Sequence, residues 1–376
     1  MEKVINIVHF CFKDGLAEIN RLIAYAKGFA ENGIKVRLLF MMPDAKRSKF
    51  LISDANMEVY HLWETTRGTS KGIIYLNSIF KLWRMIKRDQ KCFVYFNSNY
   101  VLYPLLFIND NIIAEATEHP FYDGRKPFVK TLLFNVKKLF KRNIKQLFVI
   151  STSLKSYFEN EGFERERVNI INMFVDANRF DGVKKHGNDD NFTIVYCGSI
   201  SYSKDGADIL IRAFEKFSRL HSNYILKIVG PGIDSETIPR LKELCTKLGV
   251  HDKVEFTGRV PSEDMPQILK DATILALARP DNLQAQNGFP TKLGEYLATA
   301  NPVVVTSVGD IPLFIHDKDN GLLAKPGDDN DFAKQLCWVA DNLVEAIEMG
   351  NKGKELVDKS FSSREEVKKA LKYIYG

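Results

Sequence analysis

The sequence predicts an α/β protein made of two doubly wound domains, each built on a parallel sheet covered by helices. Its 376 residues are too many for one ordinary hydrophobic core and suit two domains of this type. Short apolar runs alternate with helical patterns of about 10 to 15 residues, which is the spacing of βαβ units. The alternation stops in a polar segment near the middle of the chain and then starts again.

The first domain opens with a βαβ unit. The apolar run at residues 4–10 predicts a buried strand, residues 16–32 a helix that ends at Gly33, and residues 36–41 a second strand. Further strands are expected at 94–96 and 147–150. Between them, apolar residues recur at helical spacing, and we interpret them as core: Leu76, Ile79, Phe80, Trp83 and Ile86.

The polar segment at residues 170–191 is rich in Asn, Asp, Gly and Lys and predicts the linker between the domains. The strands expected after it are 192–197, 224–229, 254–257 and 273–278, and the helices are 207–220, 238–248 and 364–375. The resulting domains are residues 1–176 and 177–360, followed by a final segment at 361–376. A ligand is expected at the carboxyl ends of the strands, in the crevice between the domains.

Composition fits a soluble globular protein, with 45% hydrophobic and 27% charged residues. No window reaches the ~18 uninterrupted apolar residues of a membrane span, and the N-terminus lacks a basic-then-apolar signal peptide. The Cys residues at 11, 92, 197, 245 and 337 are scattered, without a CxxC motif. We therefore expect reduced thiols and a cytoplasmic protein.

Charge is unevenly distributed along the chain. Residues 1–150 hold 24 Lys and Arg against 13 Asp and Glu, whereas the remainder holds 29 against 34. Part of the excess lies in the segment 129–145, with an apolar stripe of Val129, Leu132, Leu133, Val136, Leu139 and Phe140 and a basic side of Lys137, Lys138, Lys141, Arg142 and Lys145. One interpretation is a helix packed on the sheet with a solvated basic side. The other is contact between the basic side and an anionic membrane surface. No nucleic-acid-binding motif accompanies the basic residues, so no nucleic-acid partner is expected.

A polar loop at residues 279–290 leads into a helix expected to start at Thr291 or Lys292, followed by a buried strand at 303–306. Leu293, Tyr296 and Leu297 should form the buried face of this helix. Backbone N–H groups and the positive end of the helix dipole make such an N-terminus a site for phosphate. Glu295, one turn into the helix, can accept the two hydroxyl hydrogen bonds that a ribose diol offers.

A second candidate phosphate site follows the strand that ends at Cys197. The segment 198–206 is a small, flexible loop with one cation, Lys204, before a helix. Such a loop can bind a diphosphate; the alternative is an ordinary surface turn. Gly-Lys-Ser/Thr is absent, so it is not a P-loop. Gly230-Pro231-Gly232 is a common strand-to-turn pattern and supports the fold more than the chemistry.

The residues GFPTKLGEYLA, from Gly288 to Ala298, resemble the donor site of the retaining GT-B glycosyltransferases of family 4. That family often has a Glu, seven residues and a second Glu. Glu295 matches the second, and Asn287 stands in place of the first. The linker also resembles that of the family, through Asn172, Val175, Asp176 and Phe180. The resemblance implies a GT-B fold, in which two Rossmann-like domains face each other across a cleft and the final helix packs back on the first domain.

The resemblance also implies roles for individual residues. Glu295 would hold the ribose and Lys204 the diphosphate, whereas Ser199 occupies the family's first basic position. Lys204 would act alone or together with a residue such as Lys292, and Gly258, Arg259 and Val260 would lie where the base stacks. Further donor-binding residues are implied at Gly15, Gly198, Gly230, Asn287, Gly288, Phe289, Pro290 and Thr291. In the first domain His119, with Glu118 second, would touch the transferred sugar; the alternative is a structural His before Pro120.

The function implied is retaining transfer of a sugar from a UDP- or GDP-linked donor to a hydroxyl of a glycan or lipid-linked acceptor, in cell-surface polysaccharide synthesis. No Asp-x-Asp motif stands at the expected site, so neither a metal ion nor another cofactor is expected. Two alternatives stay open: a nucleotide-sugar epimerase or hydrolase, and a non-catalytic sugar-nucleotide-binding subunit. Incubation with the donor alone would reveal the former, and measurable transfer would exclude the latter.

Overall fold

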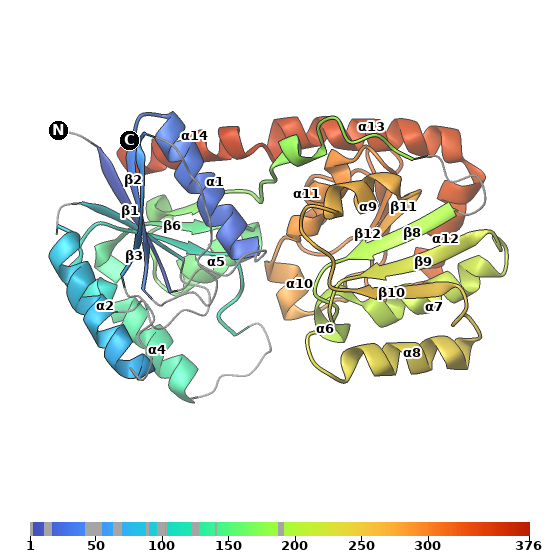
Figure 1. Ribbon diagram of the computed structural model, residues 1–376, viewed down its shortest axis with the longest axis horizontal. Coiled ribbons are helices and arrows are strands. Elements are labelled where there is room, and N and C mark those ends of the chain that lie inside the picture. The colour runs from blue at the N-terminus through green and yellow to red at the C-terminus, as the bar shows by residue number, and fades with distance from the viewer. Residues whose placement is uncertain are drawn as a thin grey trace. The chain divides into compact units, whose positions relative to one another are not determined.

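The computed structural model describes residues 3–10, 17–41, 55–62, 70–87, 90–95, 102, 104–121, 128–139, 141–186 and 192–376. The chain divides into two compact units. Unit 1 comprises Met1–Asn172 and Ser363–Gly376, and unit 2 comprises Met173–Ser362 (Figure 1). These boundaries differ by a few residues from the expected 176/177 and 360/361. Residues after Asn172 belong to unit 2 because Val175 N donates to Phe361 O at 3.1 Å and the Met173 side chain lies against Gly294.

Unit 1 is built on a parallel sheet that has seven strands within the described residues, in the order β3-β2-β1-β4-β5-β6-β7. The strands are β1 (Val4–His9), β2 (Lys35–Phe40), β3 (Met57–His61), β4 (Lys91–Tyr95), β5 (Ile112–Ala116), β6 (Ile144–Val149) and β7 (Val168–Ile170). The inner strands β1, β4 and β5 consist mostly of apolar, buried residues, as expected for a sheet covered on both faces, whereas the edge strands β3 and β7 are partly exposed.

The helices of unit 1 lie on both faces of this sheet. They are α1 (Ala17–Glu31), α2 (Lys71–Met85), α3 (Leu105–Ile108), α4 (Phe128–Leu139), α5 (Thr152–Asn160) and α14 (Ser363–Tyr375), with 3-10 turns at Lys141–Asn143 and Arg165–Arg167. Strand order runs one way from β1 to β3 and the opposite way from β4 to β7. Right-handed crossovers therefore place α1 on one face and α2 to α5 on the other. Helix α14 packs beside α1.

The apolar pattern predicted to be core in α2 is largely exposed. Leu76, Phe80 and Trp83 face solvent, and the prediction that they are core is wrong; Ile86 is buried, as predicted. The buried face of α2 is instead Ile74, Ser78 and Leu82, and Ser78 Oγ donates to Met41 O at 2.6 Å. Apolar residues occupy two neighbouring faces of this helix, so periodicity alone could not tell which one meets the sheet.

In α4 the buried aromatic residue is Phe134, whereas Leu132 and Leu139 of the expected packed stripe are exposed. The interpretation that the stripe packs on the sheet is therefore wrong for these two leucines. Of the remaining stripe, the side chains of Val129, Leu133 and Val136 and the whole of Phe140 lie outside the described part of the chain.

Unit 2 contains a parallel sheet of six strands in the order β10-β9-β8-β11-β12-β13. The strands are β8 (Phe192–Cys197), β9 (Tyr224–Val229), β10 (Val254–Gly258), β11 (Ile274–Leu277), β12 (Val303–Thr306) and β13 (Leu322–Ala324). Strand order reverses between β8 and β11. In a doubly wound sheet this switch point opens a crevice at the carboxyl ends of the strands, where ligands bind.

The helices of unit 2 lie between these strands or follow the last of them. They are α6 (Tyr202–Asp205), α7 (Ala207–Ser218), α8 (Thr237–Leu248), α9 (Met265–Asp271), α10 (Leu283–Asn287), α11 (Thr291–Ala298), α12 (Asp329–Asp341) and α13 (Leu343–Ser360), with 3-10 turns at Ala177–Phe180 (η4) and Ile311–Leu313. Helix α11 begins at the predicted residue, and Leu293, Tyr296 and Leu297 are fully buried as expected.

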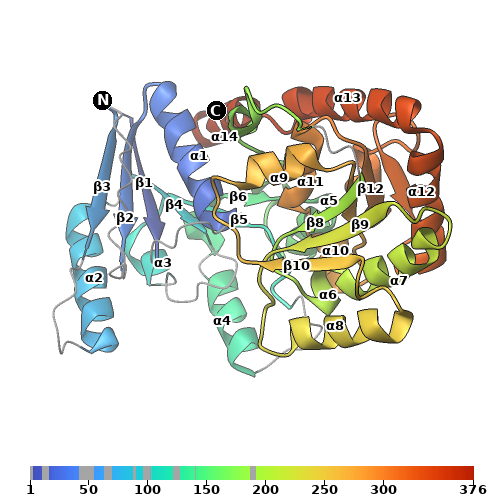
Figure 2. The ribbon, with the colours of Figure 1, turned by 45° about the vertical axis from the view of Figure 1, so that its right-hand side comes forward.

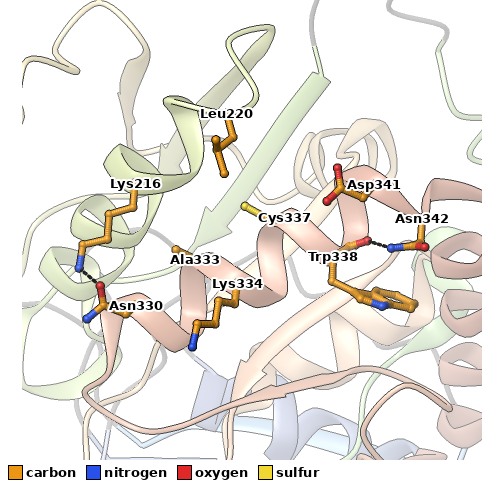
Figure 3. A pocket seen from close by; sticks show the side chains of 9 residues that line it. All are labelled: Lys216, Leu220, Asn330, Ala333, Lys334, Cys337, Trp338, Asp341 and Asn342. Atoms are coloured by element: carbon orange, nitrogen blue, oxygen red, sulfur yellow. Dashed lines mark hydrogen bonds between the residues drawn. The ribbon is translucent and has the colours of Figure 1, made fainter.

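A hollow of about 510 Å³ lies between α7 and α12 (Figure 3). Lys216 on α7 and Leu220 just after it line one side, and Ala333 and Cys337 on α12 line the other; Lys216 Nζ donates to Asn330 Oδ1 of α12. None of the residues predicted to bind a donor lines it. Within the described residues, no helix has the length and apolar character that a membrane span requires.

Candidate functional site

Three glycines meet at the carboxyl ends of β8, β9 and β10. Gly198 N donates to Val229 O, and Gly230 N donates to Gly258 O, both at 2.9 Å. Gly230 has a φ of +130°, and a Cβ there would lie 2.0 Å from Gly198 O. Only glycine fits this conformation and this approach. The loops after the three strands therefore lie backbone to backbone, and a ligand can approach their main chain closely.

Lys292, in the first turn of α11, extends over the loop that follows β8. A Cβ on Gly198 would lie 2.0 Å from Lys292 Cε. Lys292 Nζ donates to Tyr196 Oη at 3.0 Å and forms an ion pair with the buried carboxylate of Asp205. Burial raises the pKa of Asp205, but Lys292, Arg279 and Tyr196 together hold it below its ordinary value. The pair therefore stays charged and fixes a cation beside the loop.

The loop that carries Lys204 is folded into the short helix α6. Ser201 caps this helix, since its Oγ accepts a hydrogen bond from Lys204 N at 3.0 Å. The Lys204 side chain is exposed, and Gly206 ends the helix in a left-handed conformation with φ of +64°. Two lysines thus lie near the carboxyl end of β8. Lys204 on α6 is exposed, and Lys292 on α11 is paired with the buried Asp205.

Glu295 lies one turn after Lys292 on the same helix. Its Oε1 accepts a hydrogen bond from Arg179 Nη1 at 2.9 Å, and Arg179 Nη2 donates to Ser262 O at 2.8 Å. Burial raises the pKa of Glu295, whereas Arg179 and Lys292 act to lower it. Oε2 of Glu295 makes no hydrogen bond to the residues that the structure describes. One carboxylate oxygen is held by Arg179 and the other is available.

Helix α11 is fixed by a hydrogen bond to strand β8 and by ring packing just before its N-terminus. Tyr296 Oη accepts a hydrogen bond from Cys197 N at 2.8 Å. Before the helix, the Phe289 ring packs on Phe314 and Phe361, with centroid distances of 5.3 and 5.5 Å, so this side chain belongs to the core. Pro290 is also buried, and no side chain caps the N-terminus of α11. The backbone N–H groups of this turn are therefore left for an anion, beside the Lys292 side chain.

The other predicted donor residues lie around this frame. Asn287 ends α10, and its Nδ2 donates to Leu283 O at 2.9 Å. Gly288 O accepts a hydrogen bond from Arg279 Nη1 at 3.3 Å. Arg259 is exposed and Val260 half-buried after β10. Ser199 follows Gly198 directly and is exposed.

His119 and Glu118 belong to unit 1, where they follow β5. Nδ1 of His119 accepts a hydrogen bond from Phe121 N at 3.1 Å, so the proton of the neutral ring is on Nε2. The ring is buried and lies 4.2 Å from the ring of Tyr157, between centroids. These contacts hold the His119 ring in the turn after β5. Gly15 lies outside the described residues.

The residues predicted to bind the donor that unit 2 brings together lie near the carboxyl ends of its strands. They are Gly198, Ser199, Lys204, Gly230, Gly258, Thr291, Lys292 and Glu295. The residues that hold the site residues in place include Arg179, Asp205 and Tyr196, which no sequence motif indicated, and Tyr296, which the sequence indicated only as a core residue. Among the described residues, no group of His, Cys, Asp and Glu is arranged to bind a metal ion.

Residues 191–342 match the family model described as Glycosyl transferases group 1. The match covers most of unit 2 and all of the residues gathered near the carboxyl ends of its strands. Curated relatives include an uncharacterized glycosyltransferase of Methanocaldococcus jannaschii, 31% identical over 156 residues, which are 42% of this chain and 36% of that protein. The mannosylfructose-phosphate synthase of Agrobacterium fabrum is 28% identical over 203 residues, 49% of this chain and 42% of that protein. The chain spans between about a third and a half of the length of these relatives.

Solved structures match over nearly the whole chain. HepE of Anabaena, in complex with UDP and glucose, has a TM-score of 0.78 at 16% identity and covers 99% of each chain. TarM has a TM-score of 0.79 at 13% identity and covers 100% of this chain and 99% of that one. The likeness confirms the predicted α/β fold with two Rossmann-like units, the fold of the GT-B glycosyltransferases.

Proposed function

We propose that the protein is a glycosyltransferase that moves a sugar from a UDP- or GDP-linked donor to a hydroxyl of a glycan or lipid-linked acceptor, with retention of configuration. The observation that carries the proposal is that Lys292 and Glu295 stand one turn apart on α11, beside the glycine loop after β8. Both residues lie in the segment that matches the glycosyltransferase family model. A solved structure of the same fold contains UDP and glucose, which supports a nucleotide sugar as donor.

The donor is bound by groups with complementary chemistry. Glu295 accepts the ribose hydroxyls through its available oxygen. Lys292, Lys204 and the amides at the start of α11 stabilise the negative charge that develops on the diphosphate. The resemblance to the glycosyltransferase family further implies that His119, with Glu118 second, touches the transferred sugar.

The reaction that we propose exchanges one bond at the anomeric carbon for another. The bond from this carbon to the diphosphate oxygen breaks while a bond to the acceptor oxygen forms on the same face. The acceptor proton passes to the departing diphosphate, so no protein base is required. Because two lysines neutralise the leaving group, we expect no divalent ion and no other cofactor.

The acceptor and its location are also part of the proposal. A lipid-linked or polysaccharide acceptor at the inner face of the cell membrane fits the basic segment 129–145, in which α4 is followed by exposed Lys141, Arg142 and Lys145. Synthesis of a cell-surface polysaccharide is the setting that we propose.

A thermal-shift panel of UDP, GDP and ADP with their sugars tests donor binding. A ligand at 100 times its Kd stabilises the folded state by about 2.7 kcal/mol, so the matching nucleotide should raise the Tm. Glu295→Gln should remove most of this shift, since an amide cannot replace the ionised carboxylate. Glu348→Gln, at an exposed position on α13, is the matched control and should keep the full shift. A Glu295→Gln variant with undiminished nucleotide stabilisation and turnover would refute the assignment.

A further inference from the structure

We propose that the helices α2, α3 and α4 of unit 1 form a docking surface for an anionic lipid membrane, with α2 as the main contact. We call the exposed residues Ile73, Leu76, Phe80 and Trp83 the α2 stripe. Binding at this surface does not depend on the proposed catalytic activity.

The α2 stripe is a continuous apolar face of one helix. Its residues are spaced by three, four and three positions, which places them on one side of the helix. Their exposed fractions are 54, 67, 54 and 60% in chain order. The rings of Phe80 and Trp83 lie 5.9 Å apart. Four large apolar side chains on one helix face are more than the scattered single residues of an ordinary surface.

Neighbouring helices extend this surface. Phe107 on α3 and Phe128, Leu132 and Leu139 on α4 are also more than half exposed. In the described residues of unit 1, every large apolar side chain that is more than half exposed lies on these three helices; outside them Tyr60 is 36% exposed. Because α2, α3 and α4 lead into the adjacent strands β4, β5 and β6, right-handed crossovers place them on one face of the sheet. Figure 2 shows the three helices below the strands of unit 1.

The charge of this surface decides which partner fits. None of the three helices contains Asp or Glu. Lys71 and Arg84 are exposed on α2, Lys87 is exposed just after it, and the Arg84 guanidinium lies 5.8 Å from the centre of the Phe80 ring. A second copy of the chain would bring the same positive charges together. A bilayer with anionic headgroups attracts the cations and accepts the apolar side chains, and Trp and Phe suit its interfacial region.

Co-sedimentation of the full chain with vesicles tests the proposal. We expect strong binding to vesicles of phosphatidylcholine with 30% phosphatidylglycerol (about one lipid in three) and at least tenfold weaker binding to phosphatidylcholine alone. Leu76→Ser combined with Trp83→Ser should weaken binding to the anionic vesicles at least tenfold. Lys71→Ala with Arg84→Ala should weaken it about 25-fold, from about fivefold for each cation.

The matched control is Leu313→Ser combined with Val344→Ser, which removes two side chains of unit 2 that are 60 and 74% exposed. This control should bind the vesicles as well as the unchanged chain. Nucleotide-induced thermal shifts of each variant show that unit 2 is intact and test the donor proposal separately. Equal vesicle binding by the α2-stripe variant would overturn the inference. So would absence of vesicle binding together with a dimer that the same variant abolishes, because a second copy would then cover this face.

Discussion

At the scale of single residues, the carboxylate of Glu295 has to be charged in a site where burial favours its neutral form. Burial raises its pKa, and the guanidinium of Arg179 opposes the rise. Arg179 is itself oriented by the carbonyl of Ser262. It is thus a positioning residue: it keeps one oxygen of Glu295 fixed and charged while the other oxygen can meet the ligand.

Arg179→Ala is expected to change the pH dependence of donor binding. Without the guanidinium the pKa of Glu295 rises further, so the carboxylate is protonated at a higher pH when the pH falls. The KM for the donor should therefore increase at a higher pH in the variant than in the unchanged protein, and the two should approach each other at alkaline pH. Steady-state kinetics across pH measure this shift. Arg179→Lys keeps a cation, so the pH at which KM increases should return part of the way to that of the unchanged protein. If this pH is the same in Arg179→Ala and the unchanged protein, the assigned role is contradicted.

The sequence indicated Lys292 and Glu295 of α11 as candidate donor-binding residues but did not indicate the residues that hold them. Lys292 and Glu295 stand in one short motif, so their types and spacing could be read together. Their partners Asp205 and Arg179 are 87 and 116 residues away in the chain. No local sequence pattern links such distant residues, because they come together only when the sheet folds and the segments around the carboxyl ends of its strands lie side by side.

At the scale of elements, α11 and β8 form one rigid frame for the site. The hydrogen bond from Cys197 N to Tyr296 Oη and the group formed by Lys292, Tyr196 and Asp205 connect them. The buried acid contributes most to this frame, since Asp205 is only 3% exposed and a charge buried there needs its counter-ion.

Lys292→Met should destabilise unit 2 by about 3–5 kcal/mol, because it leaves the carboxylate of Asp205 buried without its cation. Adding Asp205→Asn should recover most of this loss. The folded-state pKa of Asp205 is lowered, so its contribution to stability is present above its unfolded pKa and disappears as the pH falls through the lower folded value. Urea unfolding at several pH values measures both effects.

The matched control for this prediction is Lys204→Met. Lys204 is exposed, so its loss should change the free energy of unfolding by no more than about 0.5 kcal/mol. It should weaken nucleotide binding nonetheless. Equal destabilisation by the two lysine variants would contradict the idea that the ion pair stabilises the frame.

Element boundaries in unit 2 were predicted closely because its strands are short apolar runs between turn residues. The observed β8, β9 and β12 have the predicted limits. In unit 1 the helix α2 was expected, but its buried face was assigned incorrectly. Its apolar residues cover more than one face, and only the position of the sheet shows that Ile74 and Leu82 point inward while Leu76 and Trp83 do not.

At the scale of the whole molecule, unit 1 is assembled from two stretches of chain separated by the whole of unit 2. Buried charged groups join them. Arg21 forms an ion pair with Glu115 at 2.8 Å and donates to Asn172 O, while Asn172 N donates to Glu366 on α14 at 2.8 Å. Asn172, the last residue of the first stretch, is therefore bound from both α1 and α14.

Gly28→Leu should loosen unit 1 and leave unit 2 intact. A Cβ on Gly28 in α1 would lie 2.7 Å from Val367 Cγ1 in α14, and such overpacking costs about 1–3 kcal/mol. Amide hydrogen exchange should become faster in α1 and α14 but not in the strands β8 to β13. Gly72→Ala is the control, because a Cβ added there meets nothing within 4 Å. Protection that falls equally in both units would show that they do not unfold independently.

The return of the chain to unit 1 has a consequence for synthesis on the ribosome. Translation delivers α14 after every residue of unit 2, so unit 2 can complete its sheet while unit 1 still lacks the helix that covers α1. Until then the apolar side of α1 around Gly28 is exposed to solvent in the nascent chain. A chaperone that binds apolar surfaces would bind this side of α1. Unit 1 is thus the first unit to be synthesised and the last to be completed.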